Sequence, residues 1–250
     1  MPGSEFVMET KVPVGVALRG GTLAFGDKVI FESLDLDIPA GRTTCLLGPS
    51  GVGKSSLLRM IADISPEAAA NRLVSSDGGA IEGRIAYMDQ RDLLLPWLSV
   101  LDNVTLGARL RGAAPDRQRA QALLAKVGLA GESKSLPAAL SGGMRQRAAL
   151  ARTLMEDRAI VLMDEPFSSL DALTRLRLQD LAAALLAGRT VLLVTHDPLE
   201  ALRLGHRILV MRGSPARIAS VLEPDGLPPR PADDPNLHGL AAAILAELAG

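Results

Sequence analysis

One eight-residue stretch constrains the fold more than any other part of the chain. The apolar run TTCLL leads directly into GPSGVGKS, and the helix-like SLLRMIADI follows it. In this order of strand, loop and helix, the pattern G-x-x-x-x-G-K-[ST] turns successive backbone N–H groups inward at a helix N-terminus. Such a concave surface binds phosphate. The loop comprises Gly48, Pro49, Ser50, Gly51, Val52, Gly53, Lys54 and Ser55.

Two side chains of this loop carry its chemistry. We expect Lys54 to reach the β- and γ-phosphates of a nucleotide, and the Ser55 hydroxyl to bind Mg²⁺. The alternative is a glycine turn before a helix with an ordinary surface lysine, and it leaves the match at every motif position unexplained. The loop predicts a nucleotide-binding protein of the P-loop class and leaves its activity open.

Two carboxylates follow another apolar run. In IVLMDEP, Asp164 and Glu165 come directly after four apolar residues. Carboxylates at the C-terminal end of a strand lie in the crevice where open α/β sheets bind ligands. We expect Asp164 to hold Mg²⁺ through its water shell and Glu165 to polarise an attacking water as general base. In isolation the pair would read as the start of a turn, but beside a phosphate-binding loop the second carboxylate favours a hydrolase over a nucleotide kinase.

The order of elements predicts an α/β fold with two additions. Apolar alternation before the loop, broken by Gly-Gly and Gly-Asp, predicts antiparallel strands. Apolar residues at three-to-four spacing predict helices from about 92 to 155, with Ser99 and Asp116 as N-caps. AIVLMDEP and TVLLVTHD are continuous apolar runs, typical of strands buried on both faces of a parallel sheet. ILVMRG is expected to be the last strand, and LHGLAAAILAELAG a terminal helix.

The chain divides into three parts. MPGSEF lacks the basic region and apolar core of a signal peptide, so residues 1–14 are interpreted as a tag remnant and N-terminal extension, with a natural start at Met8. Residues 15–223 form the nucleotide-binding domain. The segment from about Pro224 to Pro235, rich in proline and aspartate, is interpreted as a linker within a tail that spans 224–250. The glycine-rich NRLVSSDGGAIEG is expected to be a variable loop.

Composition excludes several classes of function. The net charge of −1 offers no bulk attraction to nucleic acid or to an anionic membrane. The single cysteine, Cys45, excludes an internal disulfide framework, fits a reducing compartment and is expected in the core. No apolar run approaches the roughly 18 residues that span a bilayer. We therefore expect a soluble, cytoplasmic protein, in which His206 and His238, which match no motif, are solvated.

A third motif makes the resemblance specific. LSGG, at Leu140 to Gly143, lies between the phosphate loop and LMDEP, and this order resembles the ATP-binding cassette (ABC) transporter ATPases over about Gly15 to Gly213. The resemblance implies a RecA-like P-loop NTPase core, an antiparallel β subdomain and an α-helical signature subdomain at about 92–155. It implies ATP and Mg²⁺ as ligands. Ser56 joins the nucleotide site, where SS replaces the commoner ST and keeps the Ser55 hydroxyl.

Four more positions match the family one at a time. Gln90 resembles the Q-loop glutamine, which touches Mg²⁺ and senses the membrane partner; the alternative is a polar residue ending a strand. Asp171 in SSLD resembles the D-loop aspartate at the dimer interface, and it can equally cap a helix. His196 matches the switch histidine that hydrogen-bonds the γ-phosphate. Phe25 falls where the family stacks an aromatic on adenine, worth on the order of 1 kcal/mol; the alternative is a half-buried strand aromatic. No guanine-reading N-K-x-D pattern is present.

The resemblance also explains the signature glycines. In the family, two copies pair head to tail, and each ATP lies between one copy's phosphate loop and the other copy's Ser141, Gly142 and Gly143. The glycines permit close backbone approach, while the serine hydroxyl and the helix N-terminus meet the γ-phosphate. Met144 replaces the usual glutamine and is expected to tune turnover. The residues implied to carry hydrolysis are Lys54, Glu165 and His196.

A subfamily follows from LLLPWLSVLDNVTLG, which begins at Leu93. This stretch resembles ATPases that serve nitrate, sulfonate, taurine and pyrimidine-precursor importers. The resemblance implies transmembrane permease subunits, a solute-binding protein acting indirectly, and a peripheral place on the cytoplasmic face of the membrane. Trp97 either lies at the permease-docking surface or packs the subdomain. The ATPase of an exporter or lipoprotein-release system shares every nucleotide motif and stays the alternative. A DNA-repair ABC protein would need a long coiled-coil insertion between the phosphate loop and the signature, where only about 85 residues lie. A ribosome-binding ABC protein would need a second cassette, and this length holds one.

Overall fold

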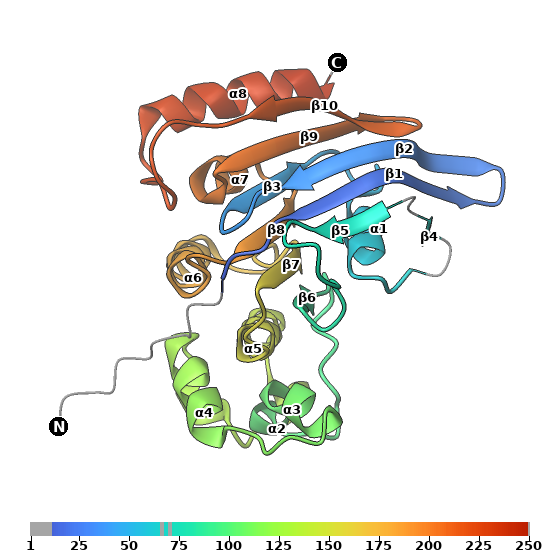
Figure 1. Cartoon of the computed structure of the whole chain (residues 1–250). Coiled ribbons are helices and arrows are strands. Elements are labelled where there is room, and N and C mark those ends of the chain that lie inside the picture. The colour runs from blue at the N-terminus through green and yellow to red at the C-terminus, as the bar shows by residue number, and fades with distance from the viewer. Residues whose placement is uncertain (1–11, 66–67, 70–71, 250) are drawn as a thin grey trace.

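A six-stranded sheet forms the centre of the molecule (Figure 1). The computed structural model describes residues 12–65, 68–69 and 72–249, so the expected start at Met8 lies outside the described residues. The strand order in the sheet is β10-β9-β3-β8-β7-β6. In chain order the strands are β3 (Thr43–Leu47), β6 (Ile85–Met88), β7 (Ile160–Asp164), β8 (Thr190–Thr195), β9 (Arg207–Gly213) and β10 (Ala216–Leu222).

From β9 to β6 the strands run parallel to one another. β7 and β8 are buried along their whole length, which confirms the parallel strands expected from their continuous apolar runs. One expectation was wrong, because ILVMRG is not the last strand: β10 follows it and pairs antiparallel with β9. β10 is an edge strand exposed at alternate positions, so its sequence has no apolar run to announce it.

A second, antiparallel sheet confirms the strands expected before the phosphate loop. β1 (Val16–Phe25) pairs with β2 (Lys28–Ile38), β4 (Ala68–Ala69) and β5 (Arg72–Ser75). Figure 1 shows the β1–β2 ribbon lying beside the central sheet. β5 corrects another expectation, since it lies within the stretch taken for a variable loop. Its four residues gain their strand conformation by pairing with Val16–Arg19, a partner far away in sequence.

Helices fill the region expected to be helical. They are α2 (Val100–Val104), α3 (Leu106–Leu110), α4 (Arg117–Lys126) and α5 (Gly142–Met155), with short 3-10 turns at Ala130–Glu132 and Pro137–Ala139. Both expected N-caps are confirmed, since Ser99 accepts a hydrogen bond from the Asp102 N–H and Asp116 one from the Arg119 N–H. The other helices are α1 (Lys54–Ile61), α6 (Ala172–Leu185), α7 (Pro198–Leu204) and α8 (Pro235–Ala249). No helix of the described residues is long and apolar enough to cross a bilayer.

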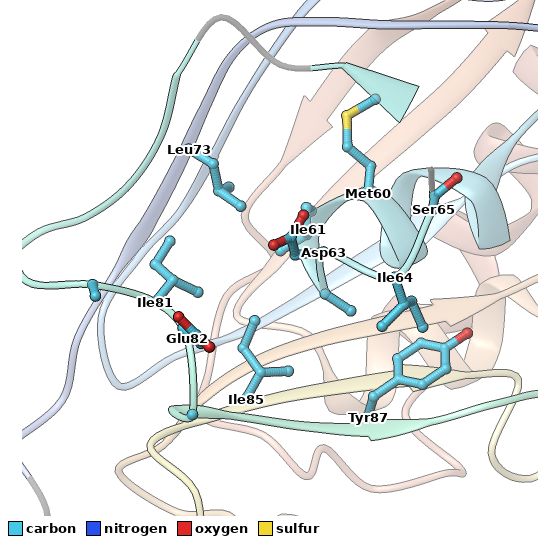
Figure 2. A pocket seen from close by; sticks show the side chains of 13 residues that line it. Met60, Ile61, Asp63, Ile64, Ser65, Leu73, Ile81, Glu82, Ile85 and Tyr87 are labelled. Carbon is cyan, nitrogen blue, oxygen red and sulfur yellow. The ribbon is translucent and has the colours of Figure 1, made fainter. Parts of the chain in front are cut away.

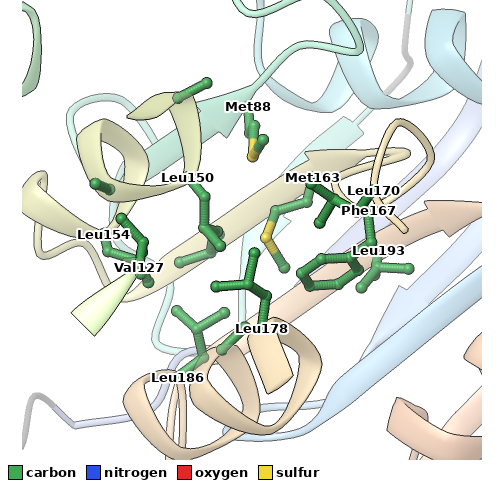
Figure 3. Close-up of a cluster of buried hydrophobic side chains, with 14 of the residues drawn as sticks. Met88, Val127, Leu150, Leu154, Met163, Phe167, Leu170, Leu178, Leu186 and Leu193 are labelled. Carbon is green, nitrogen blue, oxygen red and sulfur yellow. The ribbon is translucent and has the colours of Figure 1, made fainter. Parts of the chain in front are cut away.

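Alternate residues of the central strands belong to two different hydrophobic clusters. Ile160 and Leu162 pack with α1 and the antiparallel sheet, whereas Val161 and Met163 pack with the helices of the other face. Figure 3 shows this second cluster, where Met163 meets side chains of α5 and α6. Cys45 is fully buried in the same cluster, as expected for a small core residue, and burial raises the pKa of its thiol. The sheet is therefore covered on both faces, which leaves its strand ends to carry polar side chains.

The C-terminal tail ends in the expected helix. α8 packs against α7, and its Leu237, Ala241 and Ile244 are buried in the second cluster. Between β10 and α8 the chain has no regular secondary structure, in keeping with the proline-rich sequence. This stretch is nevertheless anchored, because Arg230 within it is 3% exposed.

Candidate nucleotide-binding site

The phosphate loop connects β3 to α1, as its sequence predicts. Gly51 and Gly53 take φ values of 80° and 112°, which side chains with a Cβ rarely adopt. A Cβ on Gly48 would lie 2.4 Å from the Met211 carbonyl oxygen of β9. The loop is therefore seated directly on the neighbouring strand, and α1 begins at Lys54, directly after the last glycine of the loop.

Lys54 lies inside the loop and not at the surface. Its ammonium group donates hydrogen bonds to the carbonyl oxygens of Gly48 and Pro49, at 2.8 and 2.9 Å. The residue is 5% exposed, and burial lowers the pKa of its ammonium group, an effect opposed by the nearby charges of Glu165 and Asp164. This geometry contradicts the alternative of an ordinary surface lysine. It puts a positive charge at the centre of the loop.

Asp164 ends β7 and is 1% exposed. Neither oxygen of its carboxylate has a hydrogen-bond partner among the described residues. Burial raises the pKa of this carboxyl group, and the Ser55 hydroxyl is near enough to offset part of the rise. Buried polar groups are normally paired, so an orphaned carboxylate beside a hydroxyl needs an explanation. Carboxylate and hydroxyl oxygens are ligands that Mg²⁺ prefers, and these two groups fit that ion.

Glu165 holds a strained backbone next to this carboxylate. Its φ is 47°, in the left-handed region that residues with a Cβ rarely occupy. The turn is secured on both sides: the Glu165 N–H donates to Val194 O at 2.9 Å, and the Ser168 hydroxyl donates to Glu165 O at 3.1 Å. Strain of this kind persists only where surrounding contacts hold it, and it concentrates at functional sites.

Three predicted residues meet at one carboxylate oxygen. Glu165 Oε2 accepts a hydrogen bond from Gln90 Nε2 at 3.3 Å and lies 3.2 Å from His196 Nδ1. Gln90 follows β6 and His196 follows β8, the strands on either side of β7. Because parallel strands end at the same edge, residues far apart in sequence converge there. The His196 side chain is 56% exposed while that of Glu165 is 14% exposed, so the histidine faces outward from the carboxylate.

Phe25 ends β1 and is half exposed. A hollow of about 270 Å³ lies next to it, between Lys28–Ile30 of the hairpin and Pro49–Val52 of the phosphate loop. Phe25 itself does not line this hollow. Its stacking role on adenine stays a prediction.

A larger cavity, of about 660 Å³, lies elsewhere (Figure 2). Met60 from α1, Ile64 from the turn that follows it, Leu73 from β5 and Tyr87 from β6 surround it. None of the residues predicted to bind nucleotide is among its described lining residues.

The signature residues stand at the exposed start of α5. Ser141 is the N-cap, and its hydroxyl accepts a hydrogen bond from the Met144 N–H at 3.3 Å. Gly142 is exposed, and a Cβ placed on it would meet nothing closer than the Arg145 guanidinium at 4.0 Å. The Met144 side chain packs partly buried against the core cluster. The Ser-Gly-Gly segment thus presents a helix N-terminus to the outside of the chain.

Asp171 caps α6, accepting a hydrogen bond from the Thr174 N–H at 3.0 Å. That bond lowers the pKa of the Asp171 carboxyl group. The helix-cap interpretation is therefore confirmed, and the interface role of this exposed residue stays a prediction. Trp97 is 71% exposed, so it does not pack the subdomain. His238 is exposed as expected, but His206 is not fully solvated, because its Nδ1 accepts a hydrogen bond from the Thr43 N–H at 3.0 Å.

Sequence reasoning missed Gln146, which joins the signature helix to the acidic turn. Its amide donates hydrogen bonds to Glu165 O at 3.4 Å and Pro166 O at 3.1 Å, and the residue is 5% exposed. A polar residue on the core side of an amphipathic helix was the available signal. Its partner was not predictable, since 19 residues separate Gln146 from Glu165.

Together these elements define a P-loop nucleotide-binding cassette: a phosphate loop, acidic and histidine side chains at neighbouring strand ends, and a glycine-rich helix start. The chain matches the ABC transporter family over residues 31–168, and it belongs to that family. It is an ATP-hydrolysing cassette of this family.

Relatives and solved structures agree with this assignment. An uncharacterized ABC transporter ATP-binding protein of Haemophilus influenzae is 43% identical over 94% of this chain and 99% of that protein. An aliphatic sulfonates import ATP-binding protein, SsuB 2, of Rhodococcus jostii is 42% identical over 94% of this chain and 93% of its own length. The dimeric structure of a bacterial ABC transporter cassette superposes with a TM-score of 0.74 at 28% identity, covering 85% of this chain and all of that one. A dimeric post-hydrolysis structure bound to ADP and Pi gives 0.73 at the same identity.

Proposed function

We propose that this chain hydrolyses ATP as one half of a head-to-tail homodimer that drives import of a small solute through separate membrane subunits. The observation that carries the proposal is the convergence of Gln90 and His196 on one oxygen of Glu165. The Lys54 ammonium group lies close enough to Glu165 to interact with the negative charge of its carboxylate. A carboxylate held in this way can orient and deprotonate a water molecule that attacks the γ-phosphate.

Each residue has a separate task in this mechanism. Backbone N–H groups of residues 48–53 and the Lys54 ammonium hold the phosphates, and His196, exposed on its outer side, donates to the γ-phosphate. Gln90 and His196 together orient Glu165, which takes the proton of the attacking water. Ser55, Asp164 and Gln90 would hold Mg²⁺, which neutralises charge that develops on the phosphates. Phe25 would stack on adenine.

The proposed dimer would complete the surroundings of the γ-phosphate with a second copy's signature residues. Ser141, Gly142 and Gly143 present a helix N-terminus outward, and such an N-terminus attracts anions. A phosphate held by one copy and contacted by the other copy's signature stabilises the pair as long as ATP is intact. Leu170 lies next to Gly143 of the signature, and Asp171, which follows Leu170, is exposed. Asp171 would therefore lie at that interface. One related cassette is dimeric in two solved structures.

The membrane partner would bind near the Q-loop. Leu93 and Trp97 are exposed apolar residues in the stretch that follows Gln90, and exposed apolar clusters mark interaction sites. A permease docked there would hold the chain peripherally on the cytoplasmic face of the membrane, with a solute-binding protein delivering substrate to the permease. Relatives named for aliphatic sulfonates import favour an organic sulfonate or a similar oxyanion. Export by a related permease remains the second candidate.

Co-purification and stimulation test this proposal. The chain is expressed with the permease and binding protein encoded beside it, reconstituted in vesicles, and assayed for ATP hydrolysis with ethanesulfonate, nitrate or no solute. We expect a solute that requires the binding protein to raise the rate of hydrolysis. Where the ATPase, ATP and solute are enclosed together in the vesicles, ATP-driven release of that solute without any binding protein would replace import by export. Hydrolysis that no membrane subunit alters would overturn the transport assignment.

A further inference from the structure

The proline-rich stretch before α8 is fastened to the molecule by one side chain. The Arg230 guanidinium donates hydrogen bonds to the carbonyl oxygens of Leu202 at 2.6 Å and Gly205 at 2.8 Å. It also donates to three carbonyl oxygens of its own segment, at Pro224, Asp225 and Gly226. The Arg230 N–H donates to Arg203 O at 2.9 Å. A segment interpreted as a linker is in fact wrapped around a buried charge.

Three of these partners, Leu202, Arg203 and the C-cap Gly205, lie at the C-terminal end of α7. The last carbonyl groups of a helix have no partner within the helix, and a cation there also meets the negative end of the helix dipole. Arg230 supplies both the hydrogen-bond donors for these carbonyl groups, from its guanidinium and its backbone N–H, and the positive charge at this helix end. Removing one member of a buried, charged hydrogen-bond network leaves its partners unsatisfied.

The other end of α7 begins at the proposed γ-phosphate sensor. Asp197, the residue after His196, is the N-cap of α7 and accepts hydrogen bonds from the N–H groups of Leu199 and Glu200. α7 spans only Pro198–Leu204, about 10 Å at 1.5 Å per residue. Arg230 and His196 therefore lie at opposite ends of one seven-residue helix.

α7 is also tied to α6 at its side. Arg203 donates to Gln179 Oε1 at 3.0 Å, and Gln179 donates to Glu200 Oε2 at 3.0 Å. Arg203 also donates to Asp180 of α6, so α7 is held at its side by α6 and at its C-terminal end by Arg230. His196, whose Nδ1 lies 3.2 Å from Glu165 Oε2, directly precedes the N-cap of this helix.

We propose that Arg230 is a positioning residue for ATP hydrolysis, which acts by holding α7 so that His196 stays in place against Glu165 and the γ-phosphate. The inference rests on the proposed role of His196. It gives the C-terminal tail a part in turnover although no tail residue is required to touch nucleotide.

A double-mutant cycle tests the proposal in the full chain, with Arg230→Gln and His196→Ala made singly and together. We expect Arg230→Gln to lower kcat on the order of tenfold, as small misplacements of catalytic groups do, while the KM for ATP changes little. In the His196→Ala background the same substitution should cause no further loss, because coupled residues are not additive. Hydrogen exchange should quicken within Pro198–Leu204.

The matched control is Arg189→Gln. Arg189 is likewise a buried arginine, 6% exposed, that donates to a backbone carbonyl, Arg158 O, and it also pairs with Asp157. It precedes β8, at the N-terminal end of that strand, whereas His196 follows the C-terminal end. The Arg189→Gln variant should have a lower melting temperature, whereas its kcat and its KM for ATP should both stay near wild type. An equal fall of kcat in both arginine variants, or independent losses from Arg230→Gln and His196→Ala, would overturn the proposal.

Arg230→Lys serves where the glutamine variant does not fold. Lysine keeps the charge but not the five-donor fork, so kcat should fall less and again only where His196 is present. Wild-type kcat together with wild-type exchange in α7 would contradict the proposal. If His196→Ala alone leaves turnover unchanged, the proposed function of His196 fails, which is distinct from a failure of the Arg230 link.

Discussion

Two pairs of glycines are assigned the same task, close approach to phosphate, yet their surroundings differ. One pair is Gly48 and Gly53 of the phosphate loop, and the other is Gly142 and Gly143 of the signature. A Cβ on Gly48 would lie 2.4 Å from Met211 O, and one on Gly53 would lie 2.7 Å from Ile30 Cγ2 with φ at 112°. Gly142 and Gly143 instead occupy the first turn of α5. A Cβ on Gly142 would have open space up to 4.0 Å, and one on Gly143 only ordinary contacts from 3.4 Å.

The first pair is required by the fold of its own chain, because no side chain fits there. The second pair is not, since an alanine in a helix is more stable than a glycine by up to about 1 kcal/mol. Glycine at Gly142 therefore weakens α5 slightly without any internal compensation among the described contacts. This difference points to a requirement outside the chain, and an approaching phosphate of a second copy is one.

The largest expected effect separates binding from chemistry. Glu165→Gln removes the base and should lower turnover by about 10²- to 10⁴-fold, while ATP binding is retained. With ATP intact, the signature of one copy stays engaged with the phosphate of the other, and an ATP-dependent dimer should accumulate. Gel filtration with and without ATP measures it. Wild-type turnover with no dimer would remove Glu165 from its assigned role.

Ser141→Arg tests whether the signature belongs to the partner's site. An arginine side chain fits the exposed start of α5 in one chain but would fill the space that a second copy must enter, so turnover should fall by roughly a hundredfold. Nucleotide affinity of the monomer should stay near wild type, as followed with a fluorescent ATP analogue. Parallel loss of affinity and phosphate release would argue for a site complete within one chain.

Alanine at Gly48 and at Gly142 should shift stability in opposite directions. Gly48→Ala forces a Cβ against a backbone carbonyl and is expected to cost about 1–3 kcal/mol, as overpacking does. Gly142→Ala should leave the unfolding free energy unchanged or raise it by up to about 1 kcal/mol, and should still slow turnover. Urea denaturation beside an ATPase assay measures both. A strongly destabilised Gly142→Ala would show that the chain itself needs that glycine.

The smallest expected effect concerns the buried network of Glu200, Gln179 and Arg203 between α6 and α7. Burial raises the pKa of Glu200 from 4.5 to about 7. The folded state therefore keeps a proton that the unfolded state releases between these values, so this contribution to stability is full below about pH 4.5 and is lost as pH rises through 7. In Glu200→Gln the melting temperature should fall less than in wild type between pH 5 and pH 8. Identical pH dependence in both would assign Glu200 an ordinary pKa.

Local patterns predicted what local physics decides. The loop from Gly48 to Ser55, the buried runs of β7 and β8 and the caps at Ser99 and Asp116 each depend on a few consecutive residues. β10 escaped prediction because an edge strand exposed at alternate positions has no apolar run, and β5 because it becomes a strand through a partner far away in sequence. Gln146 and Arg230 escaped for the same reason: a polar side chain's partner is set by the packing of distant segments.

The sequence by itself determined the class of protein, the phosphate loop and the residue types at every strand end. Those follow from spacing along one chain, through glycine conformations, apolar periodicity and the order of motifs. Only the tertiary structure decided that Gln90 and His196 share one oxygen of Glu165, that Glu165 is strained, and that Arg230 turns a proline-rich stretch into an anchor on α7. Convergence of this kind depends on how β6, β7 and β8 align at one edge, and distances across a sheet are not written in local sequence.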